Sequence, residues 1–179
     1  SVGKPNATCE MIIVDDSGNE LPQGEIGEVF MRPITGPGST YRYIGAEAKA
    51  IEGGYESIGD MGYFDVDGYL YLADRQTDMI LSGGANIYPA EVEAAIDAYP
   101  GVRSSAVIGL PHEDLGNYVY AIVDAPANDV AQEALLAHLR ERLVSYKIPR
   151  TIEFSPEPLR DDAGKVRRKA LRQARMPVT

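Results

Sequence analysis

Short runs of alternating apolar and polar positions, separated by turn residues, characterise residues 1–75. Residues 9–15 alternate enough to predict a strand, and residues 16–19 supply the Asp, Ser, Gly and Asn of a turn. Residues 24–31 predict a second short strand. Apolar residues on both sides of the Asp-Val-Asp-Gly sequence at 65–68 predict a hairpin. This part of the chain therefore reads as β-rich.

After Arg75 the pattern changes to alternating strands and helices. Residues 79–81 predict a strand that ends in a tight loop at Gly83 and Gly84. Further segments follow from the same periodicities: strands at 102–110, 118–123 and 152–154, an apolar helical face between 130 and 143, and a terminal helix at about 168–174. The change near Arg75 predicts a domain boundary, with residues 1–75 and 76–179 on its two sides.

Pro89 marks the start of a predicted helix, because the N–H that proline lacks would be unpaired in the first turn. The helix is expected to run towards Tyr99, and the Pro-Gly pair that follows ends it. Glu91 and Glu93 are expected to support this helix near its positive end.

Composition narrows the class of protein. The 44% hydrophobic content is ordinary for a folded domain, and no apolar run reaches the ~18–20 residues of a membrane span. One cysteine, Cys9, excludes an internal disulfide and a multi-cysteine metal site, and it fits a reducing cytoplasm. His112 and His138 stand isolated in the sequence, so we expect no metal ligands here. The net charge of −10 disfavours nucleic acid as a partner.

Three separated motifs carry the chemistry. Residues 54–60 read Gly-Tyr-Glu-Ser-Ile-Gly-Asp. Residues 73–93 read Ala-Asp-Arg-Gln-Thr-Asp-Met-Ile-Leu-Ser-Gly-Gly-Ala-Asn-Ile-Tyr-Pro-Ala-Glu-Val-Glu, and residues 159–167 read Leu-Arg-Asp-Asp-Ala-Gly-Lys-Val-Arg. In this order they resemble the ribose-binding, hinge and terminal Gly-Lys motifs of the adenylate-forming enzymes, the superfamily of acyl-CoA synthetases, peptide-synthetase adenylation domains and luciferases.

The resemblance implies a mixed fold. Residues 1–75 would form the β-barrel subdomain that closes the large N-terminal domain of these enzymes, and residues 76–179 their small, mobile C-terminal α/β (α+β) domain. The superfamily's Ser/Thr/Gly-rich phosphate loop and acyl pocket have no counterpart in these residues. We therefore expect the C-terminal part of a longer enzyme, inactive when isolated. The 73–93 stretch looks closest to fatty-acid and bile-acid-type CoA ligases.

Asp60 and Arg75 are the implied nucleotide-binding residues. A ribose offers two adjacent hydroxyl donors, and an ionised carboxylate accepts hydrogen bonds at both of its oxygens. A guanidinium reaches hydroxyl or phosphate oxygens in a fixed fork geometry. The alternatives are an aspartate in a turn after Gly59, and a surface salt bridge from Arg75 to Asp74 or Asp78.

Thr77 matches the hinge position, where many relatives have Asp or Lys. A hinge residue must absorb a large change in φ and ψ, which a small polar residue can do. By resemblance, Ser82, Gly83 and Gly84 line the tunnel for the pantetheine thiol after adenylation. Without the resemblance, two glycines after a strand indicate only a turn.

Lys165 matches the catalytic lysine of the first half-reaction. An ammonium offsets the negative charge that gathers around the α-phosphate of ATP when a carboxylate attacks it. Ala163 stands where relatives commonly have Ser or Thr. The other basic residues near the C-terminus are expected to form a solvated face: Arg167, Arg168, Lys169, Arg172 and Arg175.

The implied function is that of an ATP-dependent acyl-CoA synthetase, in which a carboxylic acid, ATP and CoA are the partners and Mg²⁺ is the phosphate counter-ion. Two alternatives stay open. One is an adenylation domain that loads the pantetheine of a carrier protein. The other is a non-catalytic nucleotide-binding or interaction module, in which Lys165 would be dispensable.

Overall fold

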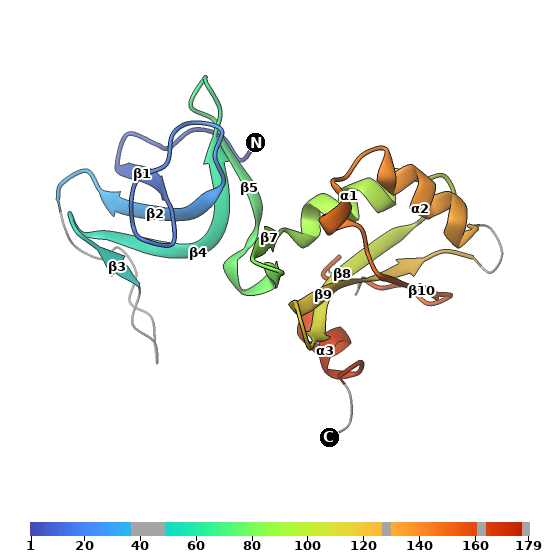
Figure 1. Cartoon of the computed structure of the whole chain (residues 1–179). Helices are drawn as coiled ribbons and strands as arrows, with labels where there is room; N and C mark the ends of the chain where they lie inside the picture. Colours follow the sequence, from blue (N-terminus) through green and yellow to red (C-terminus); the bar gives the residue numbers. More distant parts are fainter. Residues whose placement is uncertain (37–48, 127–129, 161–163, 177–179) are drawn as a thin grey trace. The chain divides into compact units, whose positions relative to one another are not determined.

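The computed structural model describes residues 1–36, 49–126, 130–160 and 164–176 (Figure 1). The chain divides between Thr77 and Asp78 into two compact units, Ser1–Thr77 (unit 1) and Asp78–Thr179 (unit 2). No helix in these described residues combines the length and apolar character needed to cross a membrane.

Unit 1 is built on an antiparallel sheet in which the alternation predicted from the sequence places Ile13, Val29 and Leu70 in the core. The sheet order is β1-β2-β4-β3, and β5 also pairs with β4. Its strands are β1 (Cys9–Val14), β2 (Gly27–Pro33), β3 (Ala50–Ile51), β4 (Tyr55–Phe64) and β5 (Leu70–Arg75). The predicted hairpin is the turn between β4 and β5, and β4 extends back over the 54–60 motif.

Gly62 sits at an irregularity in the β4–β5 pairing, where the register shifts between Met61 and Gly62. A Cβ atom at Gly62 would lie 2.6 Å from the carbonyl oxygen of Tyr71. Only glycine therefore lets the two strands approach this closely. Bulges of this kind bend a strand and re-aim the neighbouring side chains.

Unit 2 contains a mixed sheet of order β10-β9-β6-β7, with β8 also paired to β9 and β10 running parallel to β9. Its strands are β6 (Ile80–Ser82), β7 (Ala85–Ile87), β8 (Ser104–His112), β9 (Gly116–Asp124) and β10 (Thr151–Ser155). Its helices are α1 (Pro89–Asp97), α2 (Gln132–Arg140) and α3 (Arg168–Gln173), and the short 3₁₀ turns are η1 (Gln76–Asp78), which begins in unit 1, and η2 (Ser145–Lys147).

Successive residues of β8 point to opposite faces of this sheet, as the period of a strand requires. Val107 lies in the large core with Ile96 of α1 and Leu139 of α2. Ile108 faces the other side, where Leu171 of α3 packs against it. Helices α1 and α2 thus cover one face of the sheet and α3 the other (Figure 1). The predicted fold class, a β-rich subdomain followed by a small α+β domain, is confirmed.

Candidate functional site

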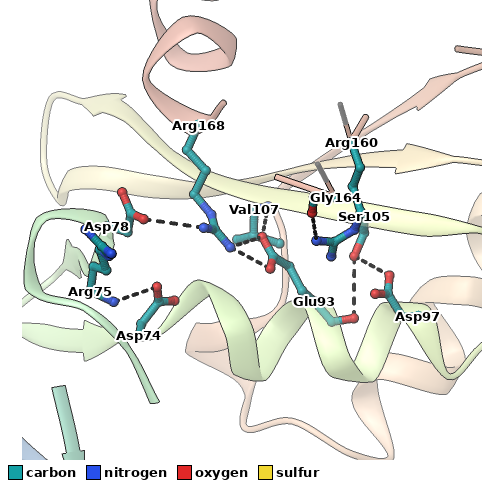
Figure 2. A network of polar contacts seen from close by, with 10 residues as sticks. All are labelled: Asp74, Arg75, Asp78, Glu93, Asp97, Ser105, Val107, Arg160, Gly164 and Arg168. Carbon is teal, nitrogen blue, oxygen red and sulfur yellow. Dashed lines mark hydrogen bonds and ion pairs between the residues drawn. The ribbon is translucent and has the colours of Figure 1, made fainter. Parts of the chain in front are cut away.

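Asp60 and Arg75 lie directly opposite each other on the neighbouring strands β4 and β5. The Oδ1 atom of Asp60 is 3.9 Å from Nε of Arg75, and their side chains are 27% and 78% exposed. The carboxylate of Asp74 accepts the backbone N–H of Arg75 at 2.8 Å (Figure 2). Two residues that are distant in sequence therefore present an acceptor pair and a donor fork at one place on the sheet, beside the bulge at Gly62. Such a pair can serve a ligand that carries both hydroxyl and phosphate groups.

Glu28 supports both members of this pair from below the surface, a role that sequence reasoning did not assign to it. It is only 4% exposed and accepts hydrogen bonds from Lys49 Nζ at 2.6 Å and from Gln76 Nε2 at 3.0 Å. It also accepts the hydroxyl of Ser57, whose oxygen in turn accepts the backbone N–H of Gly59 at 3.0 Å. The buried Glu28 carboxylate thus holds Gln76 directly and Gly59 through Ser57, and these residues adjoin Arg75 and Asp60 in the sequence.

The predicted hinge, Thr77, lies in η1 as the last residue of unit 1. On its unit 1 side, Gln76 is tied to Glu28. On its unit 2 side, the carboxylate of Asp78 lies 3.4 Å from Nη1 of Arg168. The side chains on both sides of Thr77 are therefore engaged within their own units.

Gly83 and Gly84 form the turn of the β6–β7 hairpin, with φ values of 57° and 83°. Positive φ at both positions is what tight type I′ turns require, and glycine adopts it without steric cost. The N–H of Gly83 donates to the carbonyl oxygen of Leu115 at 3.0 Å, which ties the turn to the β8–β9 connection. Sequence analysis predicted the loop but not strand β7 behind it.

A hollow of about 380 Å³ opens beside this turn. Ser82 and Gly83 form one wall, Tyr118 and Tyr146 contribute aromatic surface, and Arg150 supplies a positive charge. This volume falls within the range of small-ligand sites, roughly 300–1,000 Å³. A mostly apolar wall with one cation suits a chain-like ligand that ends in an anionic group.

Lys165 is exposed in the loop that precedes α3, and both of its neighbours in the sequence contact Arg160. The guanidinium of Arg160 donates to the carbonyl oxygen of Gly164 at 3.1 Å (Figure 2). A backbone bridge also pairs Arg160 with Val166. Gly164 has a φ of 73°, which glycine adopts freely. Both neighbours of Lys165 are thus fixed by Arg160. Ala163 lies outside the described residues.

The expectation of a solvated basic face is wrong for Arg168 and Arg175. Arg168 donates through Nη2 to both carboxylate oxygens of Glu93, at 2.8 and 2.7 Å, and Glu93 is only 6% exposed (Figure 2). Arg175 donates through two nitrogens to Glu153, from Nε to one carboxylate oxygen at 2.7 Å and from Nη2 to the other at 2.6 Å. The first pair connects the start of α3 to α1, and the second connects the residues just after α3 to β10.

Glu93 therefore does more than support the start of α1. Its carboxylate turns inward and also accepts the backbone N–H of Val107 at 2.8 Å, while Glu91 pairs with Lys147 at 2.6 Å. The sequence carried a signal for this difference: Glu93 lies next to Val92 and three residues before Ile96, on the apolar face of the helix. A charged residue on such a face indicates a buried partner elsewhere in the fold.

The contacts among Arg175, Glu153 and Tyr120 shift the pKa values of all three side chains. Hydrogen bonds from Arg175, and a further one from the Tyr120 hydroxyl at 2.7 Å, hold the pKa of Glu153 below its ordinary value. The pKa of Arg175 is raised for the same reason, chiefly by its bond to Glu153. Burial raises the pKa of Tyr120, with the carboxylate adding to the effect.

Comparison with known proteins assigns the chain to a family. Residues 91–165 match the AMP-binding enzyme C-terminal domain. The chain is 41% identical over 177 residues to 2-succinylbenzoate–CoA ligase of Geobacillus kaustophilus, covering 97% of this chain and 35% of that protein. It is 37% identical over 176 residues to the fatty acid–[acyl-carrier-protein] ligase ScoC of Streptomyces coeruleorubidus, covering 96% and 33%.

The fold agrees with these sequences. ATP-bound MatB of Rhodopseudomonas palustris superposes with a TM-score of 0.82 at 30% identity, covering 96% of this chain and 35% of that structure. The chain thus spans about a third of the length of the relatives it matches. The resemblance noted in the three motifs is confirmed: the chain belongs to the adenylate-forming enzymes and contains their AMP-binding C-terminal domain.

Proposed function

We propose that the protein carrying this chain is an ATP-dependent acid–CoA ligase. In the first half-reaction a carboxylate oxygen attacks the α-phosphorus of ATP, which gives an acyl-adenylate and releases pyrophosphate. In the second, the thiol of CoA attacks the acyl carbon, a thioester forms, and AMP leaves with the electron pair of the broken C–O bond. The observation that carries the proposal is the alignment of Asp60 with Arg75 in a member of this family.

Each assigned residue has a defined task in this scheme. Asp60 accepts the ribose hydroxyls, and Arg75 donates to ribose or phosphate oxygens. Lys165 brings its ammonium to the α-phosphate region and offsets the charge that develops there. The fixed positions of Gly164 and Val166 favour this role, because a presented charge loses less entropy on reaching its target.

The second half-reaction is assigned to the β6–β7 turn of unit 2. We propose that a rotation at Thr77 brings Ser82, Gly83 and Gly84 against the acyl-adenylate, where they line the passage of the pantetheine thiol. The hollow beside Gly83, with Arg150 on its wall, is of suitable size and charge for part of such a chain. The domain boundary near Arg75 and the mobility of residues 76–179 belong to this proposal.

Mg²⁺ would accompany the phosphates of ATP. Among the residues that the structure describes, no group of three or more His, Cys, Asp or Glu side chains is placed to hold a metal ion. We propose that Mg²⁺ is bound mainly by ATP itself and by residues outside this chain. We further propose that the enzyme acts in the cytoplasm, which the single cysteine favours. The 179-residue chain alone is expected to make no acyl-CoA, since the superfamily's phosphate loop and acyl pocket have no counterpart in its sequence.

The carrier-protein alternative is supported by a specific similarity, since ScoC is named as an acyl-carrier-protein ligase. The two acceptors share the pantetheine arm and differ in what it is attached to. The intact enzyme should be assayed for pyrophosphate and AMP release across a panel of carboxylic acids, with CoA, with a pantetheinylated carrier protein, or with neither. AMP release that depends on CoA supports the ligase, and AMP release only with the carrier protein supports the alternative.

Lys165→Ala in the intact enzyme tests the catalytic assignment. We expect adenylation to fall by about 10²–10³-fold, the usual effect of removing one charge-stabilising group. Thioester formation from added acyl-adenylate should survive. Lys169→Ala is the matched control, because Lys169 is an exposed lysine on α3 only four residues away. Unchanged adenylation in Lys165→Ala would refute the catalytic role of Lys165, whereas no pyrophosphate or AMP release by the unmodified protein with any acid would support the non-catalytic module.

A further inference from the structure

Arg168 is the point at which three segments distant in sequence meet (Figure 2). It is the first residue of α3, its Nη2 atom contacts Glu93 of α1 75 positions away, and its Nη1 atom contacts Asp78 90 positions away. Asp78 is the first residue of unit 2 and directly follows Thr77. One side chain therefore connects the entrance of unit 2, its first helix and the helix that follows the Lys165 loop.

The contact with Glu93 is geometrically restrictive. Glu93 is 6% exposed, and its carboxylate is shared between the N–H of Val107 and the guanidinium of Arg168. A buried carboxylate is stable only when its lone pairs are satisfied, so Arg168 cannot withdraw without leaving that charge uncompensated. Val107 belongs to the large core of unit 2. The guanidinium is thus held, through Glu93, against the core of the unit.

Lys165 is separated from Arg168 by two residues, and Arg160 contacts Gly164 and Val166, the residues directly before and after Lys165. The lysine is therefore presented from a short segment that Arg160 braces locally and that Arg168 connects to α1. Without the Arg168 anchor, the start of α3 could shift, and Lys165 would shift with it. A displacement of 1 Å at a reacting centre can cost about 10²-fold in rate.

We propose that Arg168 is a positioning residue for adenylation: through Glu93 and Asp78 it fixes the Lys165 loop to the end of unit 2 that adjoins Thr77, so that rotation at Thr77 delivers Lys165 as part of a rigid body. This inference rests on the proposed role of Lys165. It assigns to the buried Arg168–Glu93 pair a function in one half-reaction only.

The chain provides a matched comparison for a purely structural role. Arg175 also anchors α3, donates to both oxygens of a carboxylate as Arg168 does, and is 21% exposed against 22% for Arg168. It lies at the opposite end of the helix from Lys165. If α3 needed only to be docked, losing either arginine would have the same consequence.

The test measures both half-reactions in the intact enzyme carrying Arg168→Met, Arg168→Lys or Arg175→Met. We expect Arg168→Met to lower the rate of pyrophosphate release by about 10–100-fold. Thioester formation from added acyl-adenylate and CoA should stay within about 3-fold of the unmodified enzyme, which also shows that the variant is folded. Arg168→Lys, which keeps the charge but not the fork, should recover part of the loss. Arg175→Met should leave pyrophosphate release within about 3-fold.

The decisive readout is the double variant Lys165→Ala with Arg168→Met. Because Arg168 acts through Lys165, the double variant should adenylate no more slowly than Lys165→Ala alone. Additive losses, equal losses in both half-reactions, or the same selective loss in Arg175→Met would each overturn the inference. None of these three outcomes would contradict the proposed function. If Lys165→Ala itself keeps full adenylation, the assigned role of Lys165 falls, and the inference falls with it.

Discussion

Asp60→Asn tests the nucleotide assignment most directly, because the substitution keeps the size of the side chain and one acceptor oxygen while removing the charge. A hydrogen bond to a charged group contributes roughly 1.5–3 kcal/mol. Asp60 is 27% exposed, so water competes for its oxygens and the lower end of that range applies. The ion pair between Asp60 and Arg75 spans 3.9 Å, and the Arg75 side chain is 78% exposed, so this pair adds at most about 1 kcal/mol. We therefore expect the KM for ATP to rise by about 10- to 70-fold.

The assay compares pyrophosphate release by the intact enzyme with ATP and with 2′-deoxy-ATP. The unmodified enzyme should lose about 10-fold or more in kcat/KM when the 2′-hydroxyl is absent, since its partner is then left unpaired. Asp60→Asn should discriminate between the two nucleotides by less than about 3-fold. Asp67→Asn, on the exposed turn of the same hairpin, is the control and should behave like the unmodified enzyme. Undiminished discrimination in Asp60→Asn would refute the ribose assignment.

Three further predictions concern packing and pH. Gly62→Ala should raise the KM for ATP, because a Cβ atom there disturbs the β4–β5 register. Gly68→Ala, which has open space around its Cβ, should change the stability and leave the KM for ATP unchanged. Steady-state kinetics measure the first effect and thermal unfolding the second. Leu139→Ala should lower the free energy of unfolding by about 2–5 kcal/mol in urea, and a change below about 0.5 would contradict its core position. Because the folded-state pKa of Glu153 is depressed, its contribution is present above its ordinary pKa of 4.5 and is lost as the pH falls through the folded value. Arg175→Gln should thus destabilise at pH 7 more than at pH 3, and an equal loss at both would contradict this.

Much of the fold follows from local patterns. Alternation placed β1 and the β4–β5 hairpin, and Pro89 located the start of α1, because these signals depend on neighbours in sequence. Strand β7 was not predicted: its three residues are too short for a period to show, and its partner β6 lies across a two-residue turn. Asp60 and Arg75 were each identified from their motifs. Their pairing was not, because it depends on the register of two strands and on the bulge at Gly62.

The sequence by itself determined which residue types were available for chemistry: an aspartate and an arginine in nucleotide motifs, a lysine after glycine, and two glycines in a tight turn. Only the tertiary structure decided which charged side chains are solvated and which are buried and paired. From the sequence, Arg168 is one of several basic residues expected to be solvated, yet in the structure it donates to Glu93. Glu28 is buried and accepts hydrogen bonds from several side chains. The reason is physical: whether a charge is solvated or paired depends on which distant segments the fold brings beside it, and a local pattern carries no information about those segments.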